Sequence, residues 1–262
     1  MVDGGRTGGG TTDSVRIAVR FGIERWLWYS VRREGLDEEL VRHSHLFAGD
    51  VLEIGAGAQR RGRFVPPKTD SWIRCDLDTG RRPDVVADVQ NLPYLSGRFD
   101  VVVCLEVFEY LDCPRAALEE LRGVLKPSGL LMLSVPFMHR MDAENDYWRF
   151  TQNGLIHLLR SSGFQVVECT QQGCALAVAA EIVKQAIRTI DSSVLRKGVG
   201  VVLAPLVWGL RRLDGCIGAA SEVLRGSSTG YVCLSRQSDD VAMVRESTGG
   251  ASVNGGADAL LC

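Results

Sequence analysis

The stretch "DVLEIGAGAQRRG", residues 50–62, runs from an apolar segment into a turn that contains Gly55 and Gly57. Residues 51–54, of which all but Glu53 are apolar, have the length and composition of a short buried strand. Glycines directly after such a strand allow a tight turn and let a ligand approach the backbone N–H groups that follow. A structural loop uses glycine in the same way, so the flanking sequence has to decide what the turn holds.

Four more strand-like runs follow: "SWIRC", "DVVAD", "FDVVVCLE" and "GLLMLSVP". The helical pattern "PRAALEELRGVLKPSG" lies between the last two, with its apolar residues on one stripe and an end signal at Pro127 and Gly129. Continuous apolar strands that alternate with helices indicate a parallel sheet covered on both faces. With "FQVVECT" and "GYVCLSR" as sixth and seventh strands, we expect a doubly wound, Rossmann-like α/β fold with a seven-stranded, mostly parallel sheet.

The sixth and seventh expected strands are separated by roughly 55 residues, far more than an ordinary connection. This segment contains "AVAAEIVKQAIRTI" and "VGVVLAPLVWGLRRL", so we expect a helical insert or cap over residues 174–228. Residues 14–46 predict two further helices ahead of the first strand. We therefore expect one domain over residues 14–237. The tails at 1–13 and 238–262 that flank it have a composition that predicts disorder.

The composition narrows the function classes. A net charge of -2 over 262 residues gives no general basic field for nucleic acid, so we expect no nucleic-acid partner. The eight cysteines form no C-x-x-C pair, and the N-terminus carries no apolar signal segment. We therefore expect reduced thiols, a cytoplasmic location and no metal site.

Acidic residues stand at the ends of three successive expected strands: Glu53, Asp76 and Asp88. The carboxyl ends of parallel strands meet at one edge of the sheet, which is where open α/β folds bind ligands. An acid at the end of the second strand can accept hydrogen bonds from both hydroxyl groups of a ribose. The arrangement predicts a nucleotide-like ligand.

Five motifs in order resemble the class I S-adenosylmethionine-dependent methyltransferases, in particular those of type 11: "VLEIGAGAQ", "CDLD", "VVADVQNLPY", "FDVVVCLEVFEYL" and "LRGVLKPSGLLMLSVP". The resemblance covers residues 50–164 and implies S-adenosylmethionine as the cofactor. It places Asp76 at the ribose, Asp88 at the adenine amino group and Glu106 near the methionine amine. The full set of cofactor contacts that it implies is Glu53, Gly55, Ala56, Gly57, Asp76, Leu77, Asp88, Val89 and Glu106.

The sequence departs from this family pattern at two positions. Gln59 stands at the usual third glycine, and Tyr110 replaces the common histidine of E-x-x-E-H. A nicotinamide dinucleotide is the rival ligand, but its G-x-G-x-x-G spacing would require a glycine where Arg60 stands. The spacing therefore favours S-adenosylmethionine.

The segment "VPFMHRMDAENDYWRFT" after the fifth expected strand is the candidate acceptor site. His139 with Asp142 could act as a general base, or His139 could be a solvated loop residue. Arg149 could clamp a phosphate or carboxylate of the acceptor, or pair with Asp146 as loop scaffolding. Tyr147 and Trp148 could stack on a sugar or anchor the following helix, for which Thr151 is the expected N-cap.

We therefore expect a methyltransferase that methylates an oxygen of a small or lipid-linked acceptor. "DYWRFT" followed by "NGLIHLLRSSGF" resembles methyltransferases found with polysaccharide and glycolipid biosynthesis, which suggests a saccharide-type acceptor. A catalytically silent relative that serves as an interaction protein is one alternative, raised by Gln59 and Tyr110.

The other alternative is a peripheral membrane enzyme that acts on a lipid or quinone. Its evidence is residues 195–212, an apolar helical pattern with arginines and lysine at both ends, as in a helix that lies in the membrane interface. The uninterrupted apolar run 199–210 is about 12 residues, too short to span a bilayer. A helical cap over the substrate cleft or a dimer interface would have the same composition.

Overall fold

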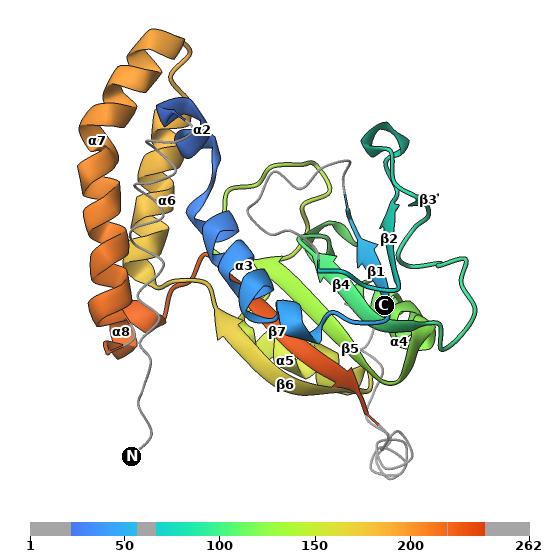
Figure 1. The fold of residues 1–262 in the computed structure, drawn as a ribbon. Coiled ribbons are helices and arrows are strands. Elements are labelled where there is room, and N and C mark those ends of the chain that lie inside the picture. Colours follow the sequence, from blue (N-terminus) through green and yellow to red (C-terminus); the bar gives the residue numbers. More distant parts are fainter. Residues whose placement is uncertain (1–21, 57–66, 219, 239–262) are drawn as a thin grey trace. The chain divides into compact units, whose positions relative to one another are not determined.

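The computed structural model describes residues 22–56, 67–218 and 220–238 (Figure 1). The chain divides into two compact units. Among the described residues, the helical unit comprises 22–38 and 172–229, and the sheet unit comprises 39–171 and 230–238. Helix α3 (Val31–Arg42) passes from one unit to the other. The tails expected at 1–13 and 238–262 lie outside the described residues, apart from Ser238.

The sheet unit is built on one seven-stranded sheet with the order β3-β2-β1-β4-β5-β7-β6. Strand β7 runs antiparallel to both of its neighbours, and the other pairs are parallel. This confirms the expected seven-stranded, mostly parallel fold. The strands are β1 (Asp50–Ile54), β2 (Ser71–Asp76), β3 (Val85–Val86), β4 (Phe99–Leu105), β5 (Leu125–Pro136), β6 (Phe164–Gln171) and β7 (Gly230–Gln237).

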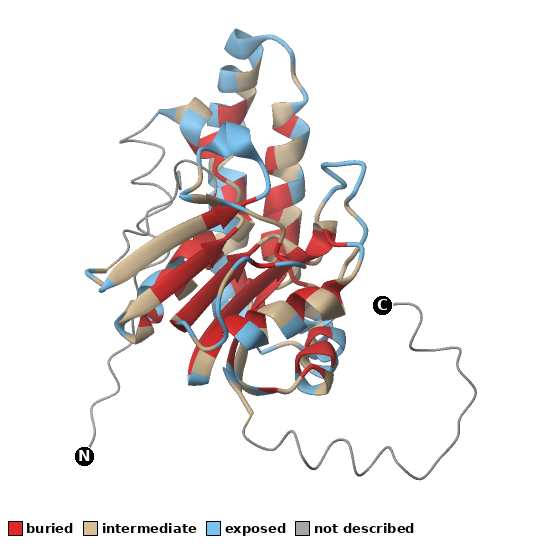
Figure 2. Cartoon of the chain, turned by 90° about the vertical axis from the view of Figure 1, so that its right-hand side faces the viewer, coloured by how far each residue is buried: buried red, intermediate tan, exposed pale blue. Residues whose placement is uncertain are grey.

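Apolar side chains of the strands and of two helices make the core of the sheet unit, and Figure 2 shows the central strands as buried. Helix α4 (Pro114–Val124) begins with a proline, which suits a first turn, and buries Leu118 and Leu121 on its predicted stripe. Full burial of each such leucine contributes about 1.5–3 kcal/mol. Helix α5 (Gln152–Ser161) begins at the predicted cap, because Oγ1 of Thr151 accepts a hydrogen bond of 3.1 Å from the N–H of Gly154.

Three short 3-10 turns complete the sheet unit: η1 (Ser44–Leu46), η2 (Thr79–Arg81) and η3 (Phe108–Tyr110). The two that follow β2 and β4 lie at the ends of those strands. They therefore shape the edge of the sheet at which the sequence predicts a ligand.

The helical unit confirms the helical insert expected before the last strand. Its elements are α2 (Ile23–Trp28), the first part of α3, α6 (Ala175–Arg188), α7 (Ser193–Leu213), the π-helical turn η4 (Asp214–Gly218) and α8 (Glu222–Arg225). Its core contains Trp26, Leu27, Ala177 and Ala180. Helix α7 comes so close to α2 that a Cβ on Gly200 would lie 2.9 Å from Leu27 Cδ1.

Buried charges hold the helices of this unit together. Lys184 is fully buried, and its ammonium group donates to the backbone oxygen of Tyr29. The same nitrogen lies 3.8 Å from Glu34 Oε1 and 4.6 Å from the centre of the Trp26 ring. Burial lowers the pKa of Lys184 to about 8, because removing the ammonium group from water disfavours its charged form.

The N-terminus of α6 is capped from a distant element. The carboxylate of Asp214, in η4, accepts hydrogen bonds of 2.8–3.1 Å from the backbone N–H groups of Cys174, Leu176 and Ala177. An anionic group at a helix N-terminus satisfies free N–H donors and complements the helix dipole. Helices α6 and α7 are thereby fixed to each other at one end.

The expectation of eight reduced thiols is wrong for two cysteines. Cys169 on β6 and Cys233 on β7 are directly opposite in the antiparallel ladder and form a disulfide. Their proximity depends on strand pairing across a sequence separation of 64 residues. Cysteine spacing along the chain therefore gave no indication of it.

Candidate cofactor and acceptor site

The parallel register of β1 with β2 and β4 brings three strand ends together. Ile54 at the end of β1 is opposite Cys75 on β2 and Cys104 on β4. The residues that follow these positions are Gly55, Asp76 and, one residue further beyond Leu105, Glu106. The sheet therefore gathers predicted cofactor residues from three strands at one edge.

Gly55 makes the turn after β1, and no other residue fits there without rearrangement. Its φ is +70°, and an added Cβ would lie 2.3 Å from Val107 Cγ2. The N–H of Gly55 donates to the backbone oxygen of Cys75 at 2.9 Å, and Ala56 bonds the same oxygen at 3.4 Å. Gly57 and Gln59 lie outside the described residues, as do Arg60, Arg61 and Arg63.

Glu53 is a buried carboxylate two residues before this glycine. The indole Nε1–H of Trp72 on β2 donates to Glu53 Oε2 at 2.8 Å. A charge that is removed from water requires partners, so the indole both stabilises and orients the carboxylate. Glu53 is thus held in one position beside the glycine turn.

Asp76, the last residue of β2, is also buried, whereas the next residue, Leu77, is largely exposed. One carboxylate oxygen of Asp76 accepts from the N–H of Asp78 at 2.9 Å. The other lies 3.5 Å from Nη1 of Arg81 in η2. The sequence identified the acid but not Arg81, whose guanidinium would compete with a ribose for the same carboxylate.

Asp88 lies beyond the end of β3, because that strand is shorter than expected and contains only two residues. Its Oδ1 accepts from the N–H of Gln90 at 2.9 Å, as in an Asx turn. Val89 beside it is buried in the core of the sheet unit. The carboxylate of Asp88 therefore fixes the local turn in which Val89 is placed.

Glu106 follows β4 in a left-handed conformation with φ of +59°. This conformation costs a non-glycine residue about 1–2 kcal/mol. Hydrogen bonds to Ser134 on β5 offset that cost: the N–H of Glu106 donates to the Ser134 oxygen, and Ser134 Oγ donates to Glu106 Oε1, both at 3.0 Å. Backbone strain of this kind is concentrated at functional sites.

The segment after β5 brings His139, Asp142 and Tyr110 together. His139 Nε2 lies 3.6 Å from Asp142 Oδ2, and the hydroxyl of Tyr110 donates to Asp142 Oδ1 at 2.8 Å. Burial, aided by the bond to Asp142, raises the pKa of Tyr110 well above its ordinary value. The phenol therefore remains protonated at neutral pH and can hold the Asp142 carboxylate in place.

Arg149 has the scaffolding partner that the sequence left open. Its guanidinium binds both carboxylate oxygens of Asp146, and it also donates to the backbone oxygens of Trp148 and Arg140. The bonds from Arg149 lower the pKa of Asp146. Asp146 Oδ2 in turn accepts from the N–H of Asp142 at 3.3 Å. The pair therefore supports the segment that carries His139 and Asp142.

The two aromatic residues of the segment differ in their surroundings. The indole of Trp148 donates to the backbone oxygen of Leu111 at 2.6 Å and stacks on Phe150. Tyr147 is fixed through its backbone N–H, which donates to the Glu109 oxygen at 2.7 Å, while its side chain is 56% exposed. Trp148 is thus an anchor, and Tyr147 presents an aromatic ring to solvent.

Comparisons with known proteins separate fold from activity. The [4+2]-cyclase SpnF has a similar structure, with a TM-score of 0.50 and 15% identity over 78% of this chain and 80% of its own. An S-adenosylmethionine-dependent methyltransferase from Mesorhizobium loti matches with a TM-score of 0.47 and 12% identity over 77% of this chain and 97% of its own. At such identities the likeness to SpnF shows the fold alone.

Sequence comparison supplies the activity class. The uncharacterized protein MJ1123 of Methanocaldococcus jannaschii is 25% identical over 149 residues, which are 48% of this chain and 70% of that protein. A family model described as a methyltransferase domain matches residues 69–133, from the approach to β2 into β5. The chain contains a class I S-adenosylmethionine-dependent methyltransferase domain. The methyltransferase uses S-adenosylmethionine as its cofactor, as its motifs imply.

Sequence reasoning about the methyltransferase missed the partners of its candidate residues. Arg81, Val107 and Ser134 each touch a residue or position that the motifs identified. At Tyr110 the sequence shows only a departure from the family histidine. Because tyrosine keeps a polar group at that position, a hydrogen bond such as the one to Asp142 could have been expected there.

Proposed function

We propose that the methyltransferase transfers the methyl group to an oxygen of its acceptor, with His139 as the general base. The observation that carries this proposal is the chain of contacts from Tyr110 to Asp142 to His139, at the carboxyl ends of β4 and β5. An imidazole oriented by a carboxylate is a common arrangement for proton transfer near neutral pH.

The strand ends have the chemistry that the cofactor requires. The carboxylates of Glu53 and Glu106 suit the methionine amine, and Asp76 suits the ribose hydroxyl groups, since carboxylates accept hydrogen bonds from both kinds of donor. Asp88 and Val89 are suited to the adenine end. Because Gly55 has no side chain, the cofactor can approach the backbone at this turn. A side chain at this position would collide with Val107. Bound S-adenosylmethionine supplies an electrophilic methyl group on a sulfonium.

The proposed proton transfer uses this chain's own groups. The imidazole of His139 takes the proton of the acceptor hydroxyl as the oxygen becomes the nucleophile. Asp142 then stabilises the positive charge of the imidazolium across the 3.6 Å to Nε2. Tyr110 and Asp146 hold Asp142 through its carboxylate and its backbone N–H. Positioning of the acceptor contributes the rest of the rate enhancement.

For the acceptor we propose a small or lipid-linked molecule of saccharide type. The exposed ring of Tyr147, on the same segment as His139, could stack on the apolar face of a sugar. The engagement of Arg149 with Asp146 weighs against a phosphate clamp at that position.

A test compares His139→Gln with His157→Gln, an exposed histidine on α5 that serves as the matched control. Formation of S-adenosylhomocysteine is followed with a panel of free sugars, prenyl-linked sugars and quinols, and cofactor affinity is measured by calorimetry. We expect His139→Gln to lower kcat at least about 100-fold with unchanged affinity for S-adenosylmethionine, and His157→Gln to behave as wild type. Full activity of His139→Gln would show that His139 is not the general base.

A further inference from the structure

Helix α7 exposes an apolar face along its whole length. Val202 is 75% exposed and Val194 is 81% exposed, in the part of the chain that the structure describes. Other large apolar side chains of the helix that are exposed are Leu195, Val201, Leu206, Trp208 and Leu213. At 100° per residue, Val194, Val202, Leu206 and Leu213 lie on one side of the helix. A contiguous apolar surface of this kind marks an interaction site.

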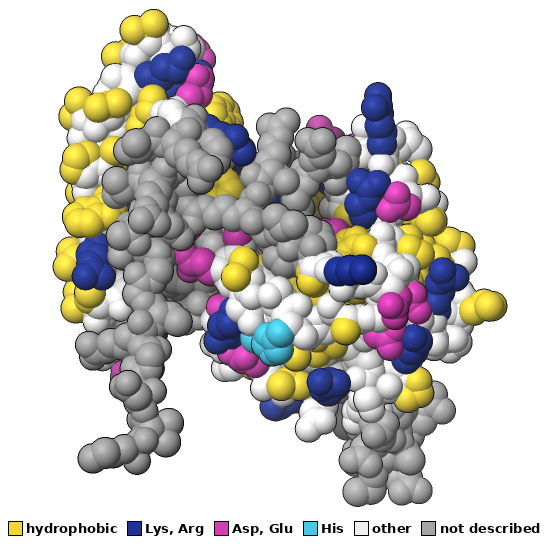
Figure 3. Space-filling model, viewed as in Figure 1, with side chains coloured by type: hydrophobic (Ala, Val, Ile, Leu, Met, Phe, Trp, Pro, Cys, Tyr) yellow, Lys and Arg dark blue, Asp and Glu magenta, His cyan; other side chains and the backbone are white. Residues whose placement is uncertain are grey.

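The charges of α7 are confined to its ends and are all positive. Its 21 residues contain Arg196 and Lys197 near the start, Arg211 and Arg212 near the end, and no acid. Figure 3 shows hydrophobic side chains along the outer side of this helix, with Lys and Arg atoms near both ends. Arg196 and Lys197 share one acid, Glu24, and Arg212 is exposed, so each end of the helix keeps an excess of positive charge. Anionic surfaces attract such a cluster.

The opposite side of α7 is committed to the helical unit. Gly200 and Val207 are buried, with Gly200 against Leu27 of α2. Arg196 binds Glu24 at 2.8 Å, and Arg211 lies 3.4 Å from Glu34. These contacts fix the helix to the unit, so only its outer face is available to a partner.

The dimensions of α7 favour a position in a membrane interface over a span. Together with η4 it forms a helix of 26 residues, Ser193–Gly218, that is long and apolar enough to cross a membrane by length and composition. Because the sequence-based expectation considered only the apolar run 199–210, it underestimated the length of this helix. However, the uncharged stretch between the two pairs of cations is only about 13 residues, or about 20 Å, and a hydrocarbon core is about 30 Å thick.

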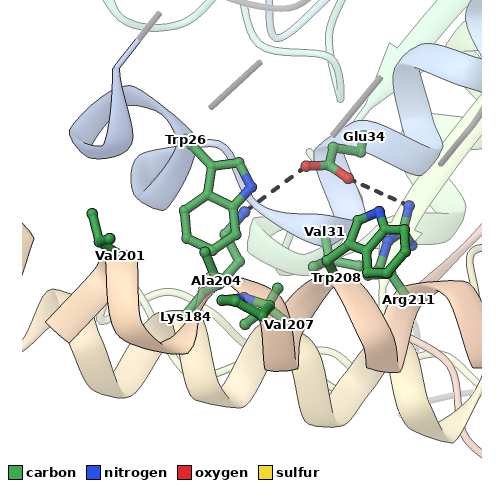
Figure 4. A pocket seen from close by; sticks show the side chains of 10 residues that line it. Trp26, Val31, Glu34, Lys184, Val201, Ala204, Val207, Trp208 and Arg211 are labelled. Atoms are coloured by element: carbon green, nitrogen blue, oxygen red, sulfur yellow. Dashed lines mark hydrogen bonds and ion pairs between the residues drawn. The ribbon is translucent and has the colours of Figure 1, made fainter. Parts of the chain in front are cut away.

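A cavity of about 400 Å³ lies beside this face, where α7 packs against α2 and α3, and its apolar lining suits a fluid apolar chain. Figure 4 shows its lining, with Val201 and Trp208 on one wall and Trp26 on another, and with Glu34 joined to Lys184 and Arg211. Hydrocarbon chains adapt to an irregular apolar hollow, whereas a second rigid helix would leave part of it empty. A tryptophan at the rim is typical of a membrane interface.

We propose that α7 lies in the interface of an anionic lipid bilayer and docks the methyltransferase on that surface through its apolar face. The exposed Arg212 attracts the lipid head groups, and Val202, Leu206 and their neighbours enter the acyl boundary. The interaction belongs to the helical unit alone. It therefore stands whether or not His139 is the base of the sheet unit.

The test is co-sedimentation of the full chain with phosphatidylcholine vesicles, with and without phosphatidylglycerol. We expect wild type to bind the anionic vesicles more tightly, with the affinity falling as salt is added. Val202→Glu should lose affinity about tenfold or more, since it replaces an apolar contact with a charge that the lipid repels. Arg212→Gln should weaken binding to the anionic vesicles only.

The matched control is Leu95→Glu, an 84% exposed apolar residue of the sheet unit, which should bind vesicles as wild type does. Circular dichroism and S-adenosylmethionine binding report whether each variant is folded. Failure of wild type to sediment with anionic vesicles would overturn the proposal, as would equal binding by Val202→Glu. A lipid-free dimer that Val202→Glu dissociates, without vesicle binding by wild type, would assign the face to a second copy instead.

Discussion

Replacement of Lys184 by methionine should remove a pH dependence from the stability of the protein. The pKa of this buried lysine falls from the ordinary 10.5 to about 8, chiefly because burial disfavours its charge. The unfolded chain therefore binds more protons than the folded one between these two pH values, so Lys184 makes stability rise as pH increases through this window. At 1.36 kcal/mol per pKa unit, the contribution between about pH 7.5 and pH 10.5 is about 3 kcal/mol.

The assay is urea denaturation of wild type and Lys184→Met across this pH range, followed by tryptophan fluorescence and circular dichroism. Buried tyrosines and cysteines titrate in the same range, but they are common to both proteins and cancel in the difference. We expect the free energy of unfolding of wild type, minus that of the variant, to increase by about 3 kcal/mol from the lower to the higher pH. The sign of the difference at neutral pH is a separate matter, because the variant also loses the contacts to Glu34 and Trp26.

Lys68→Met, which replaces an exposed lysine, is the control and should give a difference that does not change with pH. A flat difference for Lys184→Met over the same range would refute the reasoning. In that case the ammonium group would be as well solvated in the folded protein as in the unfolded chain.

Three further predictions concern the site. Gly55→Ala should destabilise the protein, because its Cβ would lie 2.3 Å from Val107 Cγ2, and Val107→Ala should relieve that clash. A double-mutant cycle in urea should therefore give a favourable coupling of about 1–3 kcal/mol, and additive effects would contradict the close approach. Tyr110→Phe should lower kcat about tenfold without changing the Kd of S-adenosylmethionine, because the variant loses one hydrogen bond to Asp142, and unchanged turnover would count against this positioning role. Asp76→Asn should raise that Kd about 10–100-fold in calorimetry, and wild-type affinity would exclude Asp76 from the ribose site.

The sheet was largely predictable because its signal is local. The strand-like residues 51–54 with the glycine turn after them, and the apolar stripe of α4, each follow from the pattern of a few adjacent residues. Strand β3 was the exception, since only Val85 and Val86 of its predicted run pair with β2. The rest of that run turns away from β2 at Asp88, whose Oδ1 accepts a hydrogen bond from the N–H of Gln90.

The partners of the candidate residues were not predictable in the same way. Lys184 and Glu34 meet only after α3, α6 and α7 have packed, and nothing in their sequence spacing anticipates that contact. Arg81 and Tyr110 likewise reach acids through short turns whose conformations leave no periodic signal. Sequence patterns therefore located the acids at the strand ends, and the structure was needed to say what each acid holds.

The point at which the helices leave the sheet has an evolutionary consequence. Gln171 at the end of β6 pairs with Tyr231 at the start of β7, and Gln172 accepts hydrogen bonds from both the N–H and the hydroxyl of Thr229. The chain thus departs and returns at neighbouring positions, so a hairpin of a few residues could join the two strands directly. Residues 172–229 are therefore a cassette that an ancestral gene could acquire, lengthen or exchange without displacing a strand. Such an exchange would have to bring a new cover for Trp26 and Leu27 on α2, which makes the N-terminal helix the part of the chain most constrained to change together with the cassette.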